Sequence, residues 1–549
     1  MNPPKKQSPQ FSSQTGLAAA LAATLAAAWL HFIFLRNAGA LWRDEAGGVQ
    51  VATLPGLGEM WRMLPHGGFP AFFPMAVRAW TALGLGDDAG LRLLGFLIGL
   101  SVLAALWWNA RAMGHRIPLL ALGLLAANIT LVRDGDELRA YGCGSLFIVL
   151  SLGLVWSLMR TPDWKRFLAA SIVGVFSVQC LYQNAFILLA VCASAAVVCL
   201  RRRQWRTAVV VLAAGLPAAL SLIPYLKPVK EAQDWWIISK IGLNAQVVWM
   251  NLSSALAAQL EWQKWIWIGM FLLAVGAGIA PLRKKPADTG IAENDLPLFA
   301  ATACATGSAG FFIFICLAQL PTQPWQYLVL ITFVAACVDA ALANWLQRHR
   351  ILPAIFAGAM ICTALPGAAK LAECRQTDID VIAAQLQTSA APSDLIIVYP
   401  WYNGVTFGRY YHGKTPWTTL PELADYRFHR YDLLKEKLRA TAPIKPVLDR
   451  VSATLASGHR IWIVGDLPKP QPGETEAPDL PPAPNSPYGW FDAPYSIVWG
   501  LQLNQLLIAS ARDIEPVPLP KSNCVSSYED LSLAVAASWR QQPSSAAPN

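Results

Sequence analysis

Long apolar segments, separated by short polar loops, fill the first two thirds of the chain. There are twelve of them, each 14 to 23 residues long. An α-helix of about 20 apolar residues spans a hydrocarbon core of about 30 Å. The pattern therefore predicts a multi-spanning α-helical membrane protein. The segments cover residues 16–35, 69–85, 91–110, 117–132, 141–159, 167–180, 183–200, 207–225, 265–281, 296–317, 324–346 and 351–369.

Basic residues cluster in the loops between these segments and fix a topology. They occupy 111–116, 160–166, 201–206, 283–285 and 348–350. Lys and Arg gather in cytoplasmic loops, yet twelve crossings would place these clusters on both sides. The conflict disappears if residues 69–85 do not cross. That segment contains Pro70, Pro74 and Arg78, which suit an interfacial helix.

The remaining eleven spans place every basic cluster on the cytoplasmic side, together with the N-terminus. The first span, 16–35, is longer than the apolar region of a usual signal peptide and is followed by Arg36, so we expect it to stay uncleaved. The prediction is an inner (plasma) membrane protein with its C-terminal region on the periplasmic, extracytoplasmic side. The loops predicted to share that outer side are 36–90, 133–140, 226–264 and 318–323.

Composition agrees with a membrane protein. Only 14% of the residues are charged and 55% are hydrophobic, whereas a soluble domain carries about 25% charged residues. The formal net charge of +9 lies mainly in the short loops, so it indicates topology rather than nucleic-acid binding. Membrane lipid is the expected surrounding.

A soluble domain is predicted after the last span. Residues 394–399 and 460–464 have the pattern of buried strands, and 379–387 and 431–438 that of helices, so an α/β domain is expected. The predicted division is a transmembrane domain over 1–370 and a soluble α/β domain over 371–549. Cys374 and Cys524 lie outside the spans and could form a disulfide in an oxidising compartment.

Candidate chemistry gathers in the predicted outer loops. Asp44 and Glu45 follow the first span, where two adjacent carboxylates need water or a charged partner. They could be a solvated loop start neutralised by Arg43, or a catalytic pair. His66 follows in the same loop. Later outer loops and span ends supply Arg92, Glu137, Arg139 and Tyr141.

The order of these residues resembles one enzyme family. An Asp-Glu pair after the first span (Asp44-Glu45), a His-x-x-x-Pro before an interfacial segment (His66 to Pro70) and an Arg opening the next span (Arg92) recur in the C-type glycosyltransferases. An acidic loop running into Arg-x-Tyr, here Glu137 to Tyr141, follows. The set looks most similar to mannosyltransferase-like members of glycosyltransferase family 39. The likeness covers about residues 10 to 370.

This resemblance implies an integral-membrane hexosyl- or pentosyltransferase of the cell envelope. It would move a sugar from a polyprenyl-phosphate donor to a glycan, lipid or protein acceptor. Asp44 matches the family's catalytic acid, with Glu45 beside it, and the segment after His66 matches the juxtamembrane helix. His66, Arg92, Glu137, Arg139 and Tyr141 are the expected substrate-binding residues. Each also has a structural alternative, as an ion pair, a packing residue or an anchor at a span end.

Two departures from the family pattern stand out. Relatives often carry a double proline after the His, where this chain has Gly67-Gly68-Phe69-Pro70. They also often have Arg-Tyr opening a late span, where this chain has Gln326-Tyr327. A phosphate anchor would then have to come from Arg139 or from a lysine of the 226–264 loop.

Other possibilities remain open from the sequence. Asp44, Glu45 and Glu137 could supply oxygen ligands for Mg²⁺ or Mn²⁺, but the sequence does not require a metal. A transporter or flippase of lipid-linked sugars or small molecules is the rival class, although such proteins usually carry charges or broken helices at mid-membrane. A non-catalytic assembly component is the third, and it would tolerate loss of Asp44.

Overall fold

The computed structural model describes most of the chain and divides it into two compact units. The described residues are 11–115, 117–236, 243–257, 260–282, 291–319, 321–349, 351–470, 479–480, 492–520 and 524–539. Unit 1 comprises residues 1–37, 69–227 and 243–373, and unit 2 comprises 38–68, 228–242 and 374–549. The first outer loop thus belongs to the same unit as the C-terminal region. The predicted division into a transmembrane domain over 1–370 and a separate soluble domain over 371–549 stays a prediction.

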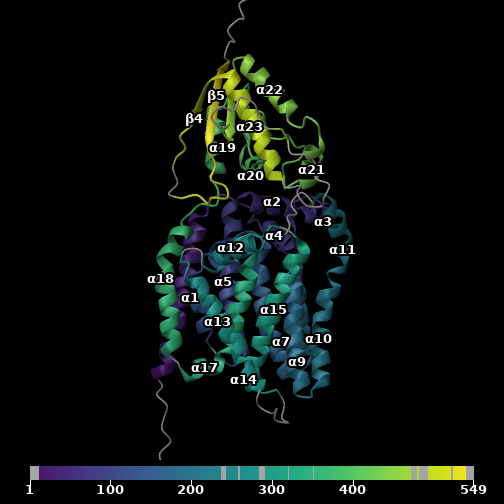
Figure 1. The fold of residues 1–549 in the computed structure, drawn as a ribbon, viewed down its shortest axis with the longest axis vertical. Coiled ribbons are helices and arrows are strands. Elements are labelled where there is room, and N and C mark those ends of the chain that lie inside the picture. Colours follow the sequence, from purple (N-terminus) through teal and green to yellow (C-terminus); the bar gives the residue numbers. More distant parts are fainter. Residues whose placement is uncertain are drawn as a thin grey trace, which may run out of the picture. The chain divides into compact units, whose positions relative to one another are not determined.

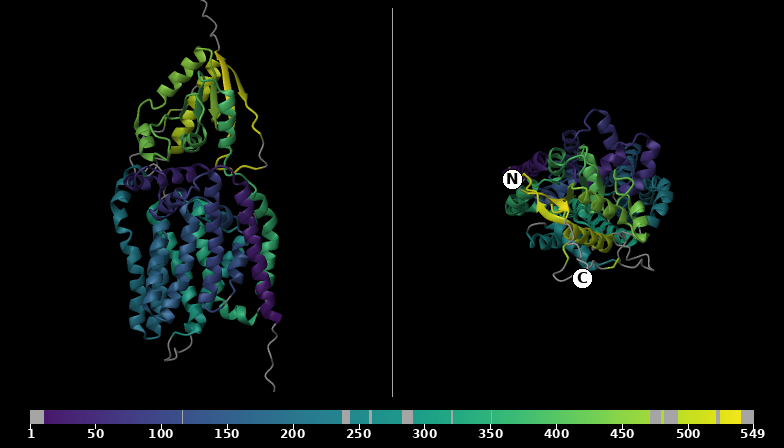
Figure 2. Two further views of the ribbon diagram at one scale, coloured as in Figure 1. Left: turned by 180° about the vertical axis from the view of Figure 1, so that it is seen from behind. Right: turned by 90° about the horizontal axis from the view of Figure 1, so that it is seen from above.

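Unit 1 is a bundle of helices that run side by side (Figures 1 and 2). Its elements up to the middle of the chain are α1 (Phe11–Asn37), α4 (Phe72–Ala82), α5 (Asp88–Ala112), α6 (Leu119–Leu125), the π-helix η1 (Thr130–Asp134), α7 (Ala140–Arg160), α8 (Trp164–Cys180), α9 (Asn184–Arg201), α10 (Trp205–Leu220) and η2 (Ile223–Tyr225). The next helix, α11 (Leu226–Trp236), begins in unit 1 and continues from residue 228 in unit 2. The later elements are α12 (Ala245–Leu256), α13 (Gln263–Ala277), α14 (Ile279–Leu282), η4 (Glu293–Asp295), α15 (Leu296–Ala318), η5 (Pro324–Tyr327), α16 (Leu328–Ala341), α17 (Ala343–Arg348) and α18 (Ile351–Ala372).

These helices confirm a multi-spanning α-helical protein. Among the described residues, nine helices are long and apolar enough to cross a membrane. Of the other two predicted spans, 167–180 forms α8, a helix of 17 residues. The second, 117–132, is not one helix: it is broken between α6 and η1. The segment predicted not to cross forms α4, whose 11 residues reach only about 16 Å.

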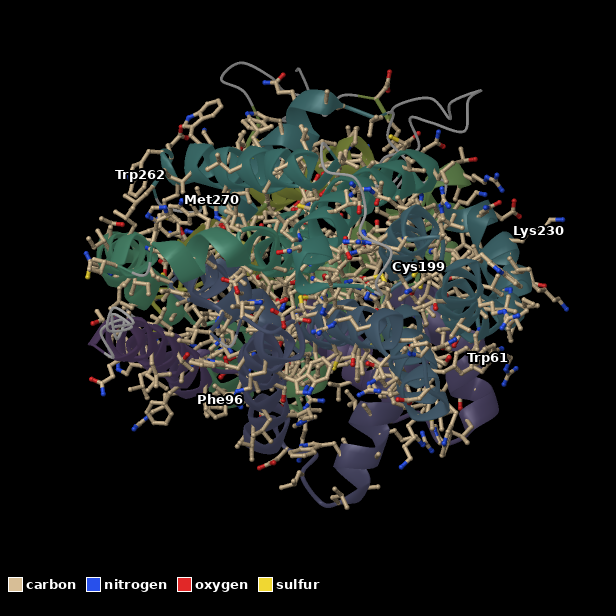
Figure 3. All side chains as sticks on the ribbon, turned by 90° about the horizontal axis from the view of Figure 1, so that it is seen from below. Trp61, Phe96, Cys199, Lys230, Trp262 and Met270 are labelled. Atoms are coloured by element: carbon tan, nitrogen blue, oxygen red, sulfur yellow. A yellow bond between two sulfur atoms is a disulfide. The ribbon has the colours of Figure 1, made fainter. Side chains whose placement is uncertain are left out.

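Large apolar side chains face outward around unit 1. Exposed examples on α1 include Leu25 and Trp29, and on α13 Leu272 and Leu273. In the view along the helix axes, Trp262 lies at the rim and Cys199 among the helices (Figure 3). An apolar surface of this extent fits a lipid environment.

The basic loops meet at one end of unit 1. Arg202 donates to both carboxylate oxygens of Asp295, at 2.8–3.1 Å. Glu293, beside it, lies 3.8 Å from Arg160. A Cβ atom on Gly114 would lie 3.5 Å from the same Glu293 carboxylate. The described residues of the loops at 111–116, 160–166, 201–206 and 282–295 therefore share one end, as the charge pattern predicts. The basic cluster at 283–285 lies outside the described residues.

The predicted outer loops of unit 1 are also joined to one another. Asn128 donates to Ala255 O at 2.9 Å, and Asn251 donates to Thr322 O at 2.6 Å. Gln183 donates to Gln326 O at 3.1 Å. Such cross-links leave few unsatisfied polar groups where the chain turns between helices.

The N-terminus of α6 has a polar partner from another helix. Asp339, from α16, accepts hydrogen bonds from the backbone N–H groups of Leu120 at 2.8 Å and Ala121 at 3.3 Å. Its second oxygen is 2.6 Å from His115 Nε2. A carboxylate at a helix N-terminus satisfies N–H groups that have no intrahelical partner. A side chain from another helix thereby caps α6.

A second buried pair fixes the loop between η1 and α7. His31 Nδ1, on α1, is 2.7 Å from Asp136 Oδ1, and both side chains are almost fully buried. Gly95 and Gly99 of α5 make room for them. A Cβ atom on Gly99 would overlap Asp136 Oδ1 and lie 2.7 Å from the His31 ring, and one on Gly95 would overlap the Asp136 carbonyl oxygen. Small residues four apart allow this close approach.

Unit 2 contains a five-stranded mixed sheet in the order β2-β1-β3-β5-β4. β1 pairs in parallel with β2 and β3, and β5 pairs antiparallel with β3 and β4. The strands are β1 (Leu395–Val398), β2 (Trp417–Thr419), β3 (Ile461–Val464), β4 (Ala511–Pro516) and β5 (Leu533–Trp539). The helices are α2 (Arg43–Ala52), α3 (Leu57–Gly67), α19 (Ile379–Ser389), η6 (Trp401–Asn403), α20 (Gly404–Tyr410), α21 (Tyr431–Arg439), α22 (Lys445–Ala456) and α23 (Asp492–Ser510).

The two central strands are buried on both faces. Ile397 and Ile463 pack in the core with α21, α22 and α23, whereas Ile396 and Trp462 pack with α19 and α20 on the other face. Strands covered on both sides are continuously apolar instead of alternating. This explains the runs at 395–398 and 461–464 and confirms the predicted strands and helices of the α/β region.

Both ends of the C-terminal region are tied together. Cys374 and Cys524 form a disulfide with Cα atoms 4.6 Å apart, which confirms the proposed pairing. Arg375 N donates to Cys524 O at 3.0 Å, and Gln376 N donates to Ala38 O at 2.8 Å. The start of the first outer loop, at Ala38, is therefore hydrogen-bonded to the segment that carries the Cys374–Cys524 disulfide.

Replacing Gly99 with Ala should destabilise unit 1. The new methyl group would collide with Asp136 and His31, and overpacking of this kind costs about 1–3 kcal/mol. We expect a lower melting temperature for the purified Gly99→Ala protein in detergent. Gly269 on α13 has nothing within 4 Å of a Cβ position, so Gly269→Ala should be neutral or slightly stabilising. Equal melting temperatures for the two variants would contradict the close packing at Gly99.

Candidate functional site

The two predicted catalytic acids occupy different environments at the start of α2. The Asp44 side chain is 22% exposed and lies 3.7 Å from Arg43 Nε. Glu45 is fully buried, and its Oε2 accepts the backbone N–H of Trp42 at 3.3 Å. Glu45 thus caps its own helix, as the acidic residue of a capping box does. Of the two acids, Asp44 is the one that solvent can reach.

Arg43 connects α2 to the C-terminal segment of unit 2. Its backbone N–H donates to Glu529 Oε2 at 2.8 Å, and its guanidinium donates to Tyr528 O at 2.9 Å. The guanidinium also lies over the Tyr402 ring, 4.4 Å from the ring centre. Contacts from backbone, carboxyl and ring together hold the start of α2 in place.

Glu529 is a buried acid with an altered pKa. Burial raises its pKa to about 8, against the smaller opposing effects of the Arg43 charge and N–H, and the nearby charge of Asp44 adds to the increase. Burial favours the neutral carboxyl because charge is poorly solvated there. Glu529 therefore carries a proton at neutral pH.

A group of aromatic side chains adjoins these acids. Trp401 Nε1 donates to Asp492 Oδ2 at 3.1 Å, and the Trp401 ring is 5.5 Å from that of Tyr431. Burial raises the pKa of Asp492 and of Tyr431, and the Asp44 charge contributes to the shift at Tyr431. The Asp44 charge therefore acts on an aromatic group and on the buried Glu529, as well as on Arg43.

His66 is held by packing within unit 2. Its Nδ1 is 3.2 Å from His429 O and 3.9 Å from Asp432 Oδ1. The ring stacks on Trp235 with centres 4.6 Å apart. Burial lowers the His66 pKa, and the Asp432 charge opposes that shift. These contacts hold the end of α3, and Trp235 joins them from the loop at 226–264. Substrate binding by His66 stays a prediction.

Three predicted substrate-binding residues meet in unit 1. The Arg139 guanidinium carbon lies 4.9 Å from the Tyr141 ring centre and 4.8 Å from that of Trp325. Its Nη1 is 3.8 Å from Glu137 Oε2. Arg139 is 8% exposed, so its charge is presented inside an aromatic surround, where cation–π attraction is stronger than in water.

Arg92 lies near the buried His31–Asp136 pair of unit 1. It is 5% exposed, its guanidinium lies 5.9 Å from the Phe34 ring centre, and its charge acts on Asp136. The structure thus joins Glu137, Arg139 and Tyr141 in one group and places Arg92 beside Asp136. Asp44, Glu45 and His66 lie in unit 2.

Sequence reasoning missed several members of these groups. Glu529, Asp492, Tyr402 and Tyr431 lie more than 350 positions from Asp44 in the chain, and no local motif marks them. Trp325 precedes the Gln326-Tyr327 pair that departs from the family pattern. Within the described ranges, no three His, Cys, Asp or Glu side chains are grouped so as to hold a metal ion. Oxygen ligation by Asp44, Glu45 and Glu137 remains only a prediction from sequence.

Comparison with known proteins finds similarity in structure alone. No family model matches the sequence, and no curated protein matches it. Among solved structures, one match is ArnT from Cupriavidus metallidurans, crystallised with bound undecaprenyl phosphate. It is 14% identical to this chain, with a TM-score of 0.49, and the match covers 82% of this chain and 92% of ArnT. Similarity this low transfers no residue role, and membership of glycosyltransferase family 39 stays a prediction.

The raised pKa of Glu529 predicts a pH dependence of stability. The native state keeps this proton up to about pH 8, whereas the unfolded chain loses it near pH 4.5. Between these values the unfolded state binds fewer protons, so stability should fall as pH rises. Glu529→Gln keeps an oxygen that can accept the Arg43 N–H and cannot ionise. Its melting temperature should therefore fall less between pH 5 and pH 8 than that of the wild-type protein.

A matched control is Glu515→Gln, because Glu515 is exposed on β4. It removes the same charge without changing a buried group, so it should keep the wild-type pH profile. A Glu529→Gln profile identical to the wild-type one would show that Glu529 does not cause the slope.

Proposed function

We propose that this protein is an integral-membrane glycosyltransferase. It transfers a hexosyl or pentosyl unit from a polyprenyl-phosphate donor to a glycan, lipid or protein acceptor on the outer face of the membrane. The observation that carries the proposal is the buried Arg139 in its aromatic surround. Asp44 is a solvent-accessible carboxylate of unit 2, and its part in the proposal rests on the family resemblance of the first outer loop.

Asp44 is the proposed general base. The acceptor hydroxyl or amine has to lose a proton as it attacks the anomeric carbon, and a positioned carboxylate accelerates that step by about 10²–10⁴-fold. Exposure of Asp44 to solvent supports this role, because an acceptor has to reach it. The burial of Glu45 and its bond to the Trp42 N–H favour a structural role for that neighbour.

Arg139 is the proposed anchor for the donor phosphate. Related enzymes often have an Arg at the position of Gln326, and this chain does not. The Arg139 guanidinium lies beside Trp325, next to that position in the chain. It can therefore replace the missing cation from a different helix. A guanidinium offers paired donors that match phosphate oxygens.

The bond changes follow from these roles. The acceptor oxygen or nitrogen forms a bond to the anomeric carbon, and its proton passes to Asp44. The bond between that carbon and the phosphate oxygen breaks, and its electron pair leaves with the lipid phosphate. Arg139 holds the donor phosphate before and during the departure of the lipid phosphate. Glu137, 3.8 Å from Arg139, would orient the guanidinium.

The C-terminal region is proposed to lie on the periplasmic side. The Cys374–Cys524 disulfide favours an oxidising compartment, and the shared end of the basic loops fits the cytoplasmic side. A cysteine introduced at Asp163, in one of the basic loops, should be protected from a membrane-impermeant reagent in intact cells. Its labelling from outside would exclude this orientation.

Asp44→Asn should reduce transfer by at least ~10²-fold, as expected for a lost general base. The amide keeps the size of the side chain, so the melting temperature should stay near that of the wild-type protein. Steady-state kinetics with a purified polyprenyl-phosphate sugar would measure the effect. Arg139→Ala should instead raise KM more than it lowers kcat, if it binds the phosphate equally in the ground and transition states.

Glu45→Gln is the matched control, because an amide oxygen can still accept the Trp42 N–H. It should retain near wild-type turnover. If Asp44→Asn kept full activity and Glu45→Gln lost it, the base would be Glu45. Full activity of both variants would reject a catalytic role for this acidic pair.

A further inference from the structure

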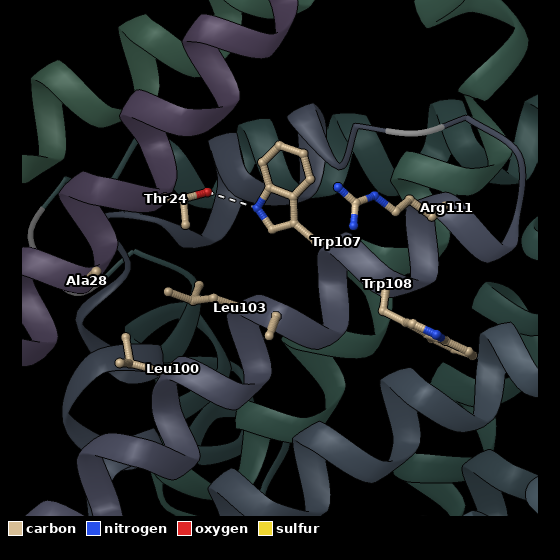
Figure 4. A pocket seen from close by; sticks show the side chains of 8 residues that line it. Thr24, Ala28, Leu100, Leu103, Trp107, Trp108 and Arg111 are labelled. Atoms are coloured by element: carbon tan, nitrogen blue, oxygen red, sulfur yellow. Dashed lines mark hydrogen bonds between the residues drawn. The ribbon is translucent and has the colours of Figure 1, made fainter.

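A groove between α1 and α5 is not explained by the proposed transfer reaction. It has a volume of about 420 Å³ and is lined by Thr24 and Ala28 of α1 and by six residues of α5. The α5 residues are Leu100, Leu103, Ala104, Trp107, Trp108 and Arg111. Figure 4 shows the groove with Arg111 and Trp108 at one end and Leu100 at the other.

The walls of the groove suit hydrocarbon. The lining is apolar except for Thr24, Arg111 and the indole N–H groups of the two Trp residues. Trp107 Nε1 donates to Thr24 Oγ1 at 3.0 Å, so two of these polar groups satisfy each other. A dry groove on the outer surface of a membrane bundle is filled by a lipid chain, because a void there would forfeit dispersion contacts.

The length of the groove matches one leaflet. Leu100 and Arg111 are eleven residues apart on one helix, which corresponds to about 16 Å. Half of a hydrocarbon core of about 30 Å is about 15 Å. The groove therefore extends from the membrane surface at Arg111 to about the bilayer centre, the space that one acyl chain occupies.

A cation stands at the surface end. Arg111 is exposed and begins one of the basic loops. Within the part of the chain that the structure describes, no carboxylate lies within 4 Å of its guanidinium. The nearby acid Asp339 is instead bound to His115. Trp108 is 38% exposed, as is typical of an aromatic residue at the lipid headgroups.

We propose that this groove binds one anionic glycerophospholipid, with an acyl chain between α1 and α5 and its phosphate on Arg111. Charge complementarity selects the headgroup, and the apolar length selects the chain. The site lies at the basic end of unit 1, whereas Arg139 lies with the loops that join the other end, so it is separate from the proposed donor site. Anionic lipids are enriched in the leaflet that faces basic loops.

The test is lipid titration of the delipidated full-length protein in neutral detergent, followed by native mass spectrometry. Phosphatidylglycerol and phosphatidylcholine with identical acyl chains isolate the headgroup charge. One basic residue near a membrane surface corresponds to about a five-fold preference for the anionic lipid. Arg111→Gln should abolish that preference. Ala104→Phe should fill the groove and weaken binding of both lipids; Ala104 is exposed, so the protein should still fold.

Arg206→Gln is the matched control. Arg206 is an exposed arginine in another basic loop and lies over the neighbouring Trp205 ring, and it does not line the groove. This variant should keep the five-fold preference. The proposal is overturned if Arg111→Gln keeps the preference, if Arg206→Gln loses it equally, or if Ala104→Phe binds both lipids as the wild-type protein does. Equal binding of free glycerol phosphate would also overturn it, because the groove would then contribute nothing.

Discussion

Polar groups inside the helical unit have to find partners within the bundle, because hydrocarbon offers none. Asp339 meets this constraint by accepting from two N–H groups of α6 and by pairing with His115. Asp136 meets it by pairing with His31. Each carboxylate joins helices that are distant in sequence, so satisfying a buried charge also fixes the arrangement of the bundle. Gly95 and Gly99 of α5 provide the space for the His31–Asp136 pair.

The same constraint bears on the choice between an enzyme and a transporter. Transporters place charges near mid-membrane to bind their cargo. Three buried acids of unit 1 are already engaged: Asp339 caps a helix, Asp136 pairs with His31 and Asp295 pairs with Arg202. At the break between α6 and η1, Asn128 accepts from the Leu131 N–H and donates to Ala255 O. Because these acids already have partners within the bundle, they favour an enzyme, whose helices hold its loops in place, over a transporter.

Hydropathy and charge make the bundle predictable. Spans are long and repetitive, and the basic loops carry one consistent signal. Loop charge, together with Pro70, Pro74 and Arg78, therefore identifies 69–85 as the apolar segment that does not cross. The strands at 395–398 and 461–464 are equally visible in the sequence, because burial on both faces leaves an uninterrupted apolar run. The break in the fourth apolar segment, 117–132, is not visible there: Asn128, which follows α6, accepts from the Leu131 N–H and donates to Ala255 O, more than 120 positions away.

The candidate site is only half predictable for a related reason. Local motifs identify Asp44, Glu137 and Arg139, but the groups that set their chemistry come from distant segments. Glu45 also carries a partial signal: it stands three residues after Trp42, the spacing of a capping box, but Trp is not the usual N-cap residue. Because the usual Ser or Thr is missing at the N-cap, the sequence does not reveal that Glu45 caps α2. It therefore also does not reveal that Asp44 is the more exposed acid of the pair.

The acids around Arg43 differ in how readily they ionise. Arg43 has one positive charge and three acids near it: Asp44, Glu529 and Asp492. Burial raises the pKa of Glu529 to about 8 and that of Asp492 above its ordinary value. Protonation of Glu529 removes one negative charge that would otherwise compete for the guanidinium at neutral pH. The partly exposed Asp44 carboxylate, 3.7 Å from Arg43 Nε, is then a charged partner of this arginine. Ionisation of Glu529 above pH 8 would add a competing negative charge beside the same arginine. Glu529, which accepts the Arg43 N–H at the start of α2, therefore also affects the electrostatic surroundings of Asp44, the proposed base.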